Sequence, residues 1–126
     1  MTNPLDIQIG GNHYKKYKIQ PVELYNTFEL GFGEANIIKY SMRHQDKNGV
    51  QDLEKISHYC DLMIGFNKPV GKPIPIEYIE SFCNLNDISL FAKNVLEELS
   101  LWLTYESLEY LNNVKALVRE ELSKYK

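Results

Sequence analysis

The sequence has no long apolar run. No stretch approaches the ~18 apolar residues that a membrane-spanning helix requires. The first residues, MTNPLDIQIGGNHYKK, also lack the basic region and apolar core of a secretory signal. We therefore expect a cytoplasmic protein with no membrane partner.

Cysteine and histidine are scarce. The two cysteines, Cys60 and Cys83, each lie in an apolar helical pattern, so we expect both thiols to be reduced and buried. His13, His44 and His58 are too widely spaced for a zinc site, and no C-x-x-C motif occurs. The sequence predicts no metal site.

Motifs of common nucleotide enzymes are also missing. Neither G-x-x-x-x-G-K-[ST] nor G-x-G-x-x-G occurs, which excludes a kinase with an ordinary phosphate loop. No convincing set of nucleophile, base and orienting group is visible. Adjacent acids such as Glu97-Glu98 are typical of a solvated surface rather than a magnesium site.

The composition is that of a soluble globular domain. The 126 residues suffice for one domain with a core, and 44% of them are hydrophobic and 25% charged. A net charge of −3 argues against broad nucleic-acid binding. The charge is uneven, because residues 10–55 hold seven basic and six acidic residues whereas residues 76–126 hold five and nine. The first half is therefore the better place for an anion.

Apolar spacing predicts helices throughout. Gln20-Pro21 begins the first helix, since proline suits the first helical position, and Gly31 is a natural stop. Phe32-Gly33 is expected to be a connector. Two further helices are predicted, one from about Glu34 to Asn48-Gly49 and one from Val50 to about Phe66.

The rest of the chain contains one clear linker. Residues 67–75, NKPVGKPIP, hold three prolines and a glycine and cannot remain helical. A short helix from about Ile76 to Cys83 is expected next. No glycine or proline interrupts residues 87–126, which predicts either one helix of nearly forty residues or two helices that break near Thr104. An unbroken helix would reach ~60 Å and would need a partner, which favours a homo-oligomer.

Together these patterns predict an all-α fold. We expect a small helical domain with a helical hairpin core, followed by a long C-terminal helix or helix pair. Residues 1–66 are the expected ligand-binding domain, 67–75 the linker and 76–126 a C-terminal oligomerisation module. One compact monomeric bundle is the alternative.

The strongest candidate site is the hairpin of residues 34–59. Helical spacing aligns polar residues along one side of each of its helices, and antiparallel packing would let the two sides line one cleft. Cations, an amide, a carboxylate and phenols suit an anionic ligand with a flat ring, such as a nucleotide. Two ordinary solvated faces are the alternative. The residues concerned are Asn36, Lys39, Tyr40, Arg43 and Lys47 on the first helix and Asp52, Lys55 and Tyr59 on the second.

An N-terminal segment could add to this site. The adjacent glycines Gly10 and Gly11 can direct successive backbone amides at one phosphate or carboxylate. His13, Tyr14 and Lys15 follow at once and combine rings with a cation. A Gly-Gly pair is more often simply a turn.

These residues, over about residues 10–66, resemble the pattern of a small bacteriophage family described as nucleotide-kinase-like or of unknown function. Ala35 stands where that family usually has glycine, and residues 74–126 have no counterpart. The resemblance implies nucleotide binding. The matching elements are Gly10, Gly11, His13, Tyr14 and Lys15, then Gln20-Pro21, then Asn36, Lys39, Tyr40 and Arg43, then Lys47 and Gly49, and finally Asp52, Leu53, Lys55 and Tyr59.

Three functions follow as expectations. The first is a phage-encoded protein of the host cytoplasm that sequesters a nucleotide or a cyclic-nucleotide immune signal as an anti-defence device, without a cofactor. The second is a nucleoside monophosphate kinase without a phosphate loop, which would use Mg²⁺. The third is a non-catalytic adaptor that binds a host protein through its C-terminal helix.

Overall fold

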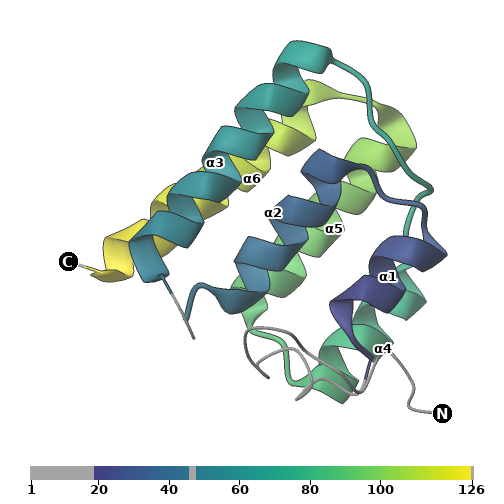
Figure 1. The fold of residues 1–126 in the computed structure, drawn as a ribbon, viewed down its shortest axis with the longest axis horizontal. Helices are drawn as coiled ribbons and strands as arrows, with labels where there is room; N and C mark the ends of the chain where they lie inside the picture. The colour runs from purple at the N-terminus through teal and green to yellow at the C-terminus, as the bar shows by residue number, and fades with distance from the viewer. Residues whose placement is uncertain (1–18, 46–47, 126) are drawn as a thin grey trace, which may run out of the picture.

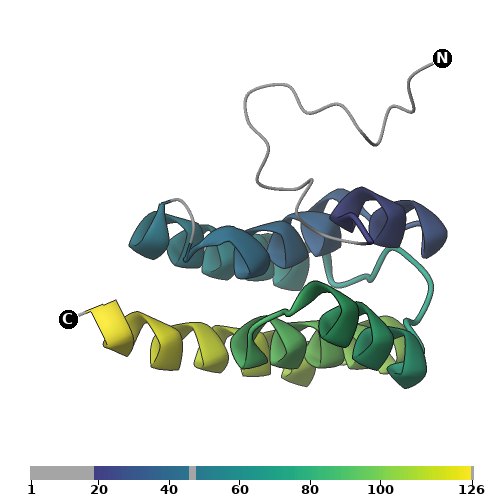
Figure 2. The same cartoon turned by 90° about the horizontal axis from the view of Figure 1, so that it is seen from below.

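The described part of the chain forms two layers of three helices. The computed structural model describes residues 19–45 and 48–125. Figure 2 shows α1, α2 and α3 in one layer and α4, α5 and α6 in the other. In Figure 1, α1 lies over α4, α2 over α5 and α3 over α6. The all-α prediction is confirmed, and no strand occurs within the described residues.

The first layer comprises α1 (Pro21–Thr27), α2 (Phe32–Arg43) and α3 (Gly49–Phe66). Pro21 occupies the first turn of α1, and the Glu23 side chain accepts a hydrogen bond from the Gln20 backbone N–H at 2.6 Å. Helices α2 and α3 pack side by side and run antiparallel, as predicted (Figure 1). The predicted connector Phe32-Gly33 is wrong, because both residues belong to the first turn of α2.

The second layer comprises α4 (Ile76–Asn86), α5 (Leu90–Tyr105) and α6 (Leu108–Leu122), followed by the 3₁₀ turn η2 (Ser123–Tyr125). The segment before α4 is non-helical, as its prolines predicted, and α4 extends three residues beyond the expected Cys83. The C-terminal region is two helices. The chain breaks at Glu106, whose φ of 56° is left-handed, and Ser107 caps α6.

This break removes the reason for expecting an oligomer. Since the chain turns back at Glu106, α6 packs on α3 and α5 of the same molecule and needs no second copy to cover its apolar side. The homo-oligomer stays a prediction. Within the described residues, no helix is long and apolar enough to span a membrane.

One hydrophobic core joins the two layers. Ile37 and Leu53 of the first layer and Leu99, Trp102 and Val114 of the second are fully buried in the same cluster. The helices within residues 19–45 and 48–66 therefore share a core with those of residues 76–125, whereas the division into a front domain and a C-terminal module stays a prediction.

Candidate functional site

Positive charge gathers around one aromatic ring where α2 and α3 meet. The Tyr40 ring has the Arg43 guanidinium carbon at 4.7 Å, the Lys55 Nζ at 4.9 Å and the Lys39 Nζ at 5.3 Å from its centroid. Cations at such distances are attracted to the face of an aromatic ring. The Tyr40 ring also stacks on that of Tyr59, with centroids 6.1 Å apart and planes 13° apart. We call these five residues the Tyr40 cluster.

A buried carboxylate holds two of the cations. Asp52 is fully buried and accepts hydrogen bonds from the Arg43 Nε at 3.2 Å and Nη2 at 3.4 Å. The Lys55 Nζ lies 3.8 Å from Asp52 Oδ1, and the Asn48 backbone N–H donates to Asp52 Oδ2 at 3.4 Å. Asp52 thus positions cations from beneath the surface. Lys39 forms no ion pair with any residue in the described ranges.

Beyond Tyr59 the surface becomes apolar and hollow. The Phe32 ring meets Tyr59 edge to face at 5.6 Å, and a hollow of about 190 Å³ lies beside these two rings. Phe66 forms another wall. Phe32 and Phe66 are 75% and 76% exposed, which is unusual for phenylalanine. We call this the Phe32 hollow.

A charged group also lines the Phe32 hollow. Glu34 is 2% exposed, and its Oε2 accepts hydrogen bonds from the Val70 backbone N–H at 2.9 Å and the Trp102 indole N–H at 3.2 Å. Gly31 leaves space for this carboxylate, because a Cβ there would lie 2.8 Å from Oε1. The carboxylate therefore joins α2, the linker and α5 at the edge of the hollow.

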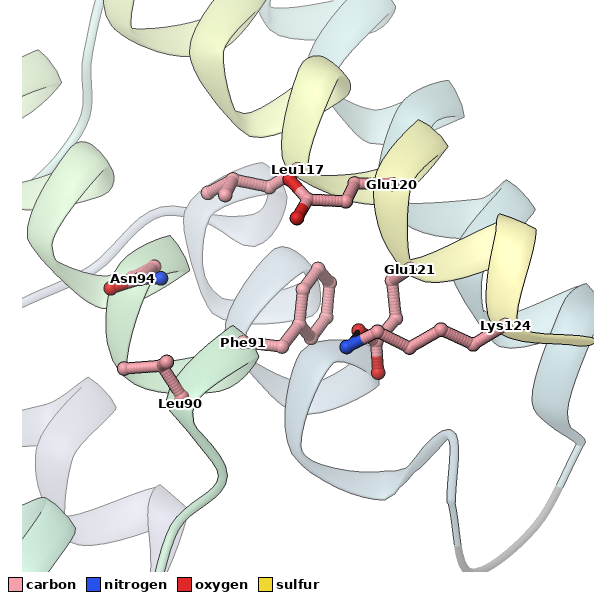
Figure 3. A pocket seen from close by; sticks show the side chains of 7 residues that line it. All are labelled: Leu90, Phe91, Asn94, Leu117, Glu120, Glu121 and Lys124. Carbon is pink, nitrogen blue, oxygen red and sulfur yellow. Dashed lines mark ion pairs between the residues drawn. The ribbon is translucent and has the colours of Figure 1, made fainter.

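A second hollow, of about 100 Å³, lies between the start of α5 and the end of α6 (Figure 3). The Phe91 ring and the Glu121 and Lys124 side chains line it. The buried Glu121 carboxylate already pairs with the Lys124 Nζ at 2.9 Å and lies 3.4 Å from the His44 Nε2. This hollow is smaller, and its central charge is neutralised by groups of the protein.

The structure places the predicted site residues as follows. It brings together six of them, Lys39, Tyr40, Arg43, Asp52, Lys55 and Tyr59. Asn36 instead donates its side-chain amide along its own helix to the Phe32 carbonyl at 2.8 Å. The remaining predicted residues lie outside the described ranges: Gly10, Gly11, His13, Tyr14, Lys15 and Lys47.

Comparison with known proteins adds one match. Residues 7–61 match a family model described as a protein of unknown function (DUF3310). The match covers less than half of the chain and includes the whole Tyr40 cluster. No curated protein and no solved structure shows significant similarity to the chain.

The expected resemblance to a nucleotide-kinase-like family is therefore wrong. The family that matches the same region is of unknown function, and nothing in the comparisons indicates a kinase-like family. Short motifs of Gly, Tyr, Lys and Arg do not define a family or an activity, because such residues serve many anionic ligands.

Sequence reasoning missed Glu34, Phe32 and Phe66. Glu34 resembled an ordinary acidic residue in the first turn of a helix, and its burial depends on Trp102, which is 68 positions away. The available signal was the two phenylalanines, which do not fit the apolar stripes of their helices.

Proposed function

We propose that the protein binds a small phosphorylated ligand that carries a flat ring, as a nucleotide does. The supporting observation is the Tyr40 cluster, in which three cations converge on one half-exposed ring with one carboxylate beneath them. This local excess of positive charge occurs in a chain with a net charge of −3. A surface that is both cationic and aromatic fits an anion attached to a ring better than either alone.

The three cations would play different parts in binding, because their surroundings differ. Lys39 has no carboxylate partner among the described residues, and the Lys55 side chain is 41% exposed, so both can reach a phosphate. The Arg43 side chain is 13% exposed and is held by Asp52. Arg43 would therefore contribute mainly a fixed positive charge. Asp52 would set the positions of Arg43 and Lys55 rather than contact the ligand.

We propose that the protein binds this ligand without converting it. The expected consequence is that a signal nucleotide is withheld from other proteins. The Asp52 carboxylate beneath the Tyr40 cluster is already engaged by Arg43 and Lys55. A phage origin and an anti-defence role stay predictions.

Lys39→Ala tests this proposal. Calorimetric titration with a mixture of nucleoside monophosphates and with cyclic dinucleotides should show binding to the wild-type chain. The variant should bind the same ligand at least about tenfold more weakly, because a charge-assisted contact contributes roughly 1.5–3 kcal/mol. Raising the salt concentration should weaken wild-type binding more than variant binding.

Lys93→Ala is the matched control. It removes the same charge from α5 in the other layer and should leave the affinity unchanged. Equal losses of affinity in the two variants would show that only the net charge of the protein matters, which would contradict the proposal. Conversion of a monophosphate in the presence of ATP and Mg²⁺ would contradict binding without turnover.

A further inference from the structure

The Tyr40 cluster and the Phe32 hollow are continuous. Tyr59 belongs to both, since its ring stacks on that of Tyr40, meets that of Phe32 edge to face and lines the hollow. Along α2, Phe32 and Tyr40 are separated by roughly 12 Å at 1.5 Å per residue. The cations gather at one end of this row of rings, and the apolar hollow lies at the other.

We infer that the Phe32 hollow is the subsite for the ring of the ligand whose phosphate the Tyr40 cluster binds. This inference rests on the proposed function and adds the orientation of the bound ligand. The ring lies towards the start of α2, between Phe66 and Tyr59, and the phosphate lies towards Arg43 at the end of α2. A nucleoside monophosphate has this arrangement of an anion at one end and a flat, largely apolar ring at the other.

Glu34 gives the subsite a chemical preference. Its Oε2 is occupied by the Val70 and Trp102 donors, whereas Oε1 accepts no hydrogen bond from the residues that the structure describes. Glu34 lines the hollow, and a largely buried carboxylate there favours a hydrogen-bond donor in the ligand and disfavours another acceptor. The preferred ring therefore carries an N–H group on the edge that faces Glu34.

The exposed phenylalanines fit the same role. An apolar side chain that remains mostly exposed gains little from folding, whereas a ring stacked against it would remove both surfaces from water. Phe32 and Phe66 border the hollow from α2 and from the end of α3, and Lys68 stands next to them at the start of the linker. Two such rings at the same opening support occupation by a third.

Glu34→Gln is the direct test. The amide oxygen of glutamine can still accept from Val70 and Trp102, so the fold should persist, but its NH₂ donor then replaces the acceptor Oε1 of a residue that lines the hollow. We expect the affinity for nucleoside monophosphates to fall roughly tenfold or more. Ribose 5-phosphate, which has the phosphate but no base, should bind wild type and variant equally and more weakly than the nucleotides.

Phe66→Ala provides a second variant with little risk to folding, because this side chain is 76% exposed. Loss of a stacking surface should weaken nucleotide binding about fivefold or more and leave ribose 5-phosphate unaffected. Glu109→Gln on α6 is the matched control for Glu34→Gln, since it removes one carboxylate from an exposed position in the other layer. It should change the affinity for neither the nucleotides nor ribose 5-phosphate.

The chain also carries its own reporter. Trp102 is the sole tryptophan of the sequence, and its indole N–H donates to Glu34. A ring bound against Glu34 should change the Trp102 emission, whereas ribose 5-phosphate should not.

The outcomes separate the two proposals. Nucleotide binding that is weakened by Lys39→Ala but by neither Glu34→Gln nor Phe66→Ala would overturn the ring subsite and leave the phosphate site intact. Equal wild-type affinities for nucleotides and ribose 5-phosphate would do the same. Absence of binding by any phosphorylated ligand would overturn the proposed function, and the ring subsite with it.

Discussion

Replacing Arg43 with methionine should destabilise the protein strongly, although Arg43 lies on the ligand-binding surface that we propose. Methionine retains much of the aliphatic stem but removes the guanidinium. The fully buried Asp52 then keeps only the Asn48 N–H at 3.4 Å and the Lys55 ammonium at 3.8 Å among its described partners. A buried charge that loses its main partner is costly because the interior solvates it poorly.

The magnitude follows from these remaining contacts. Breaking a fully buried ion pair typically costs about 3–5 kcal/mol. Because Lys55 and Asn48 still face the carboxylate, we expect the free energy of unfolding to fall by about 2–4 kcal/mol. That is a large part of the roughly 5–15 kcal/mol available to a single domain. For a chain of this length, a loss of this size lowers the melting temperature by roughly 10 °C.

Urea denaturation followed by Trp102 fluorescence measures the effect. The midpoint should fall without a change in the m-value, as expected for a loss of native stability alone. The double variant Arg43→Met with Asp52→Leu should recover most of the loss, since it leaves no unpaired buried charge. Arg119→Met on the exposed side of α6 is the matched control and should change stability by less than about 0.5 kcal/mol.

A loss below about 0.5 kcal/mol for Arg43→Met would refute the reasoning, because that is the range of ordinary surface substitutions. A double variant no more stable than the single one would refute it as well. If the prediction holds, a loss of affinity measured for Arg43→Ala would combine a loss of folded protein with a loss of ligand contacts. Lys39, which has no carboxylate to leave unpaired among the described residues, is then the better probe of the ligand.

Two further predictions concern stability. Burial raises the pKa of the Cys60 thiol from 9.0 to about 12 and that of Cys83 to about 11, so the unfolded chain loses these protons at lower pH than the folded chain does. The stability that the two protonated thiols contribute should be complete below pH 9 and should decline as the pH rises towards their folded-state pKa values. The urea midpoint should therefore be lower at pH 10.5 than at pH 7, and equal midpoints would contradict this prediction. Deletion of residues 76–126 should abolish cooperative unfolding, because it uncovers Ile37 and Leu53; a sigmoidal thermal transition in the circular dichroism of the truncated chain would show instead that the front helices fold alone.

Much of the candidate site could be predicted from sequence because it is local. Tyr40 and Arg43 lie three residues apart on one helix, and Asp52, Lys55 and Tyr59 follow the same periodicity on the next helix. A turn of a few residues then requires the two helices to pack as neighbours. These contacts depend on spacing and on a short connection, both of which are visible in the chain.

The role of each residue in the site was harder to predict than which residues belong to the site. Asp52 was expected to line the cleft with the other polar residues, yet its carboxylate is fully buried under Arg43 and Lys55. Spacing places a residue on one side of a helix but does not give its depth. Depth depends on what the opposite layer covers, as the burial of Glu34 by Trp102 also illustrates.

The sequence by itself determined that the chain is helical, where the proline-rich linker interrupts it and that six of the polar residues named from spacing meet between α2 and α3. Tertiary structure alone decided the break at Glu106 and the Phe32 hollow. No glycine or proline marks the break, and a glutamate accepts a left-handed φ of 56° only at some cost. The cost is outweighed because a continuous helix would leave Leu111, Val114 and Val118 in water, whereas the turn buries them against α3 and α5.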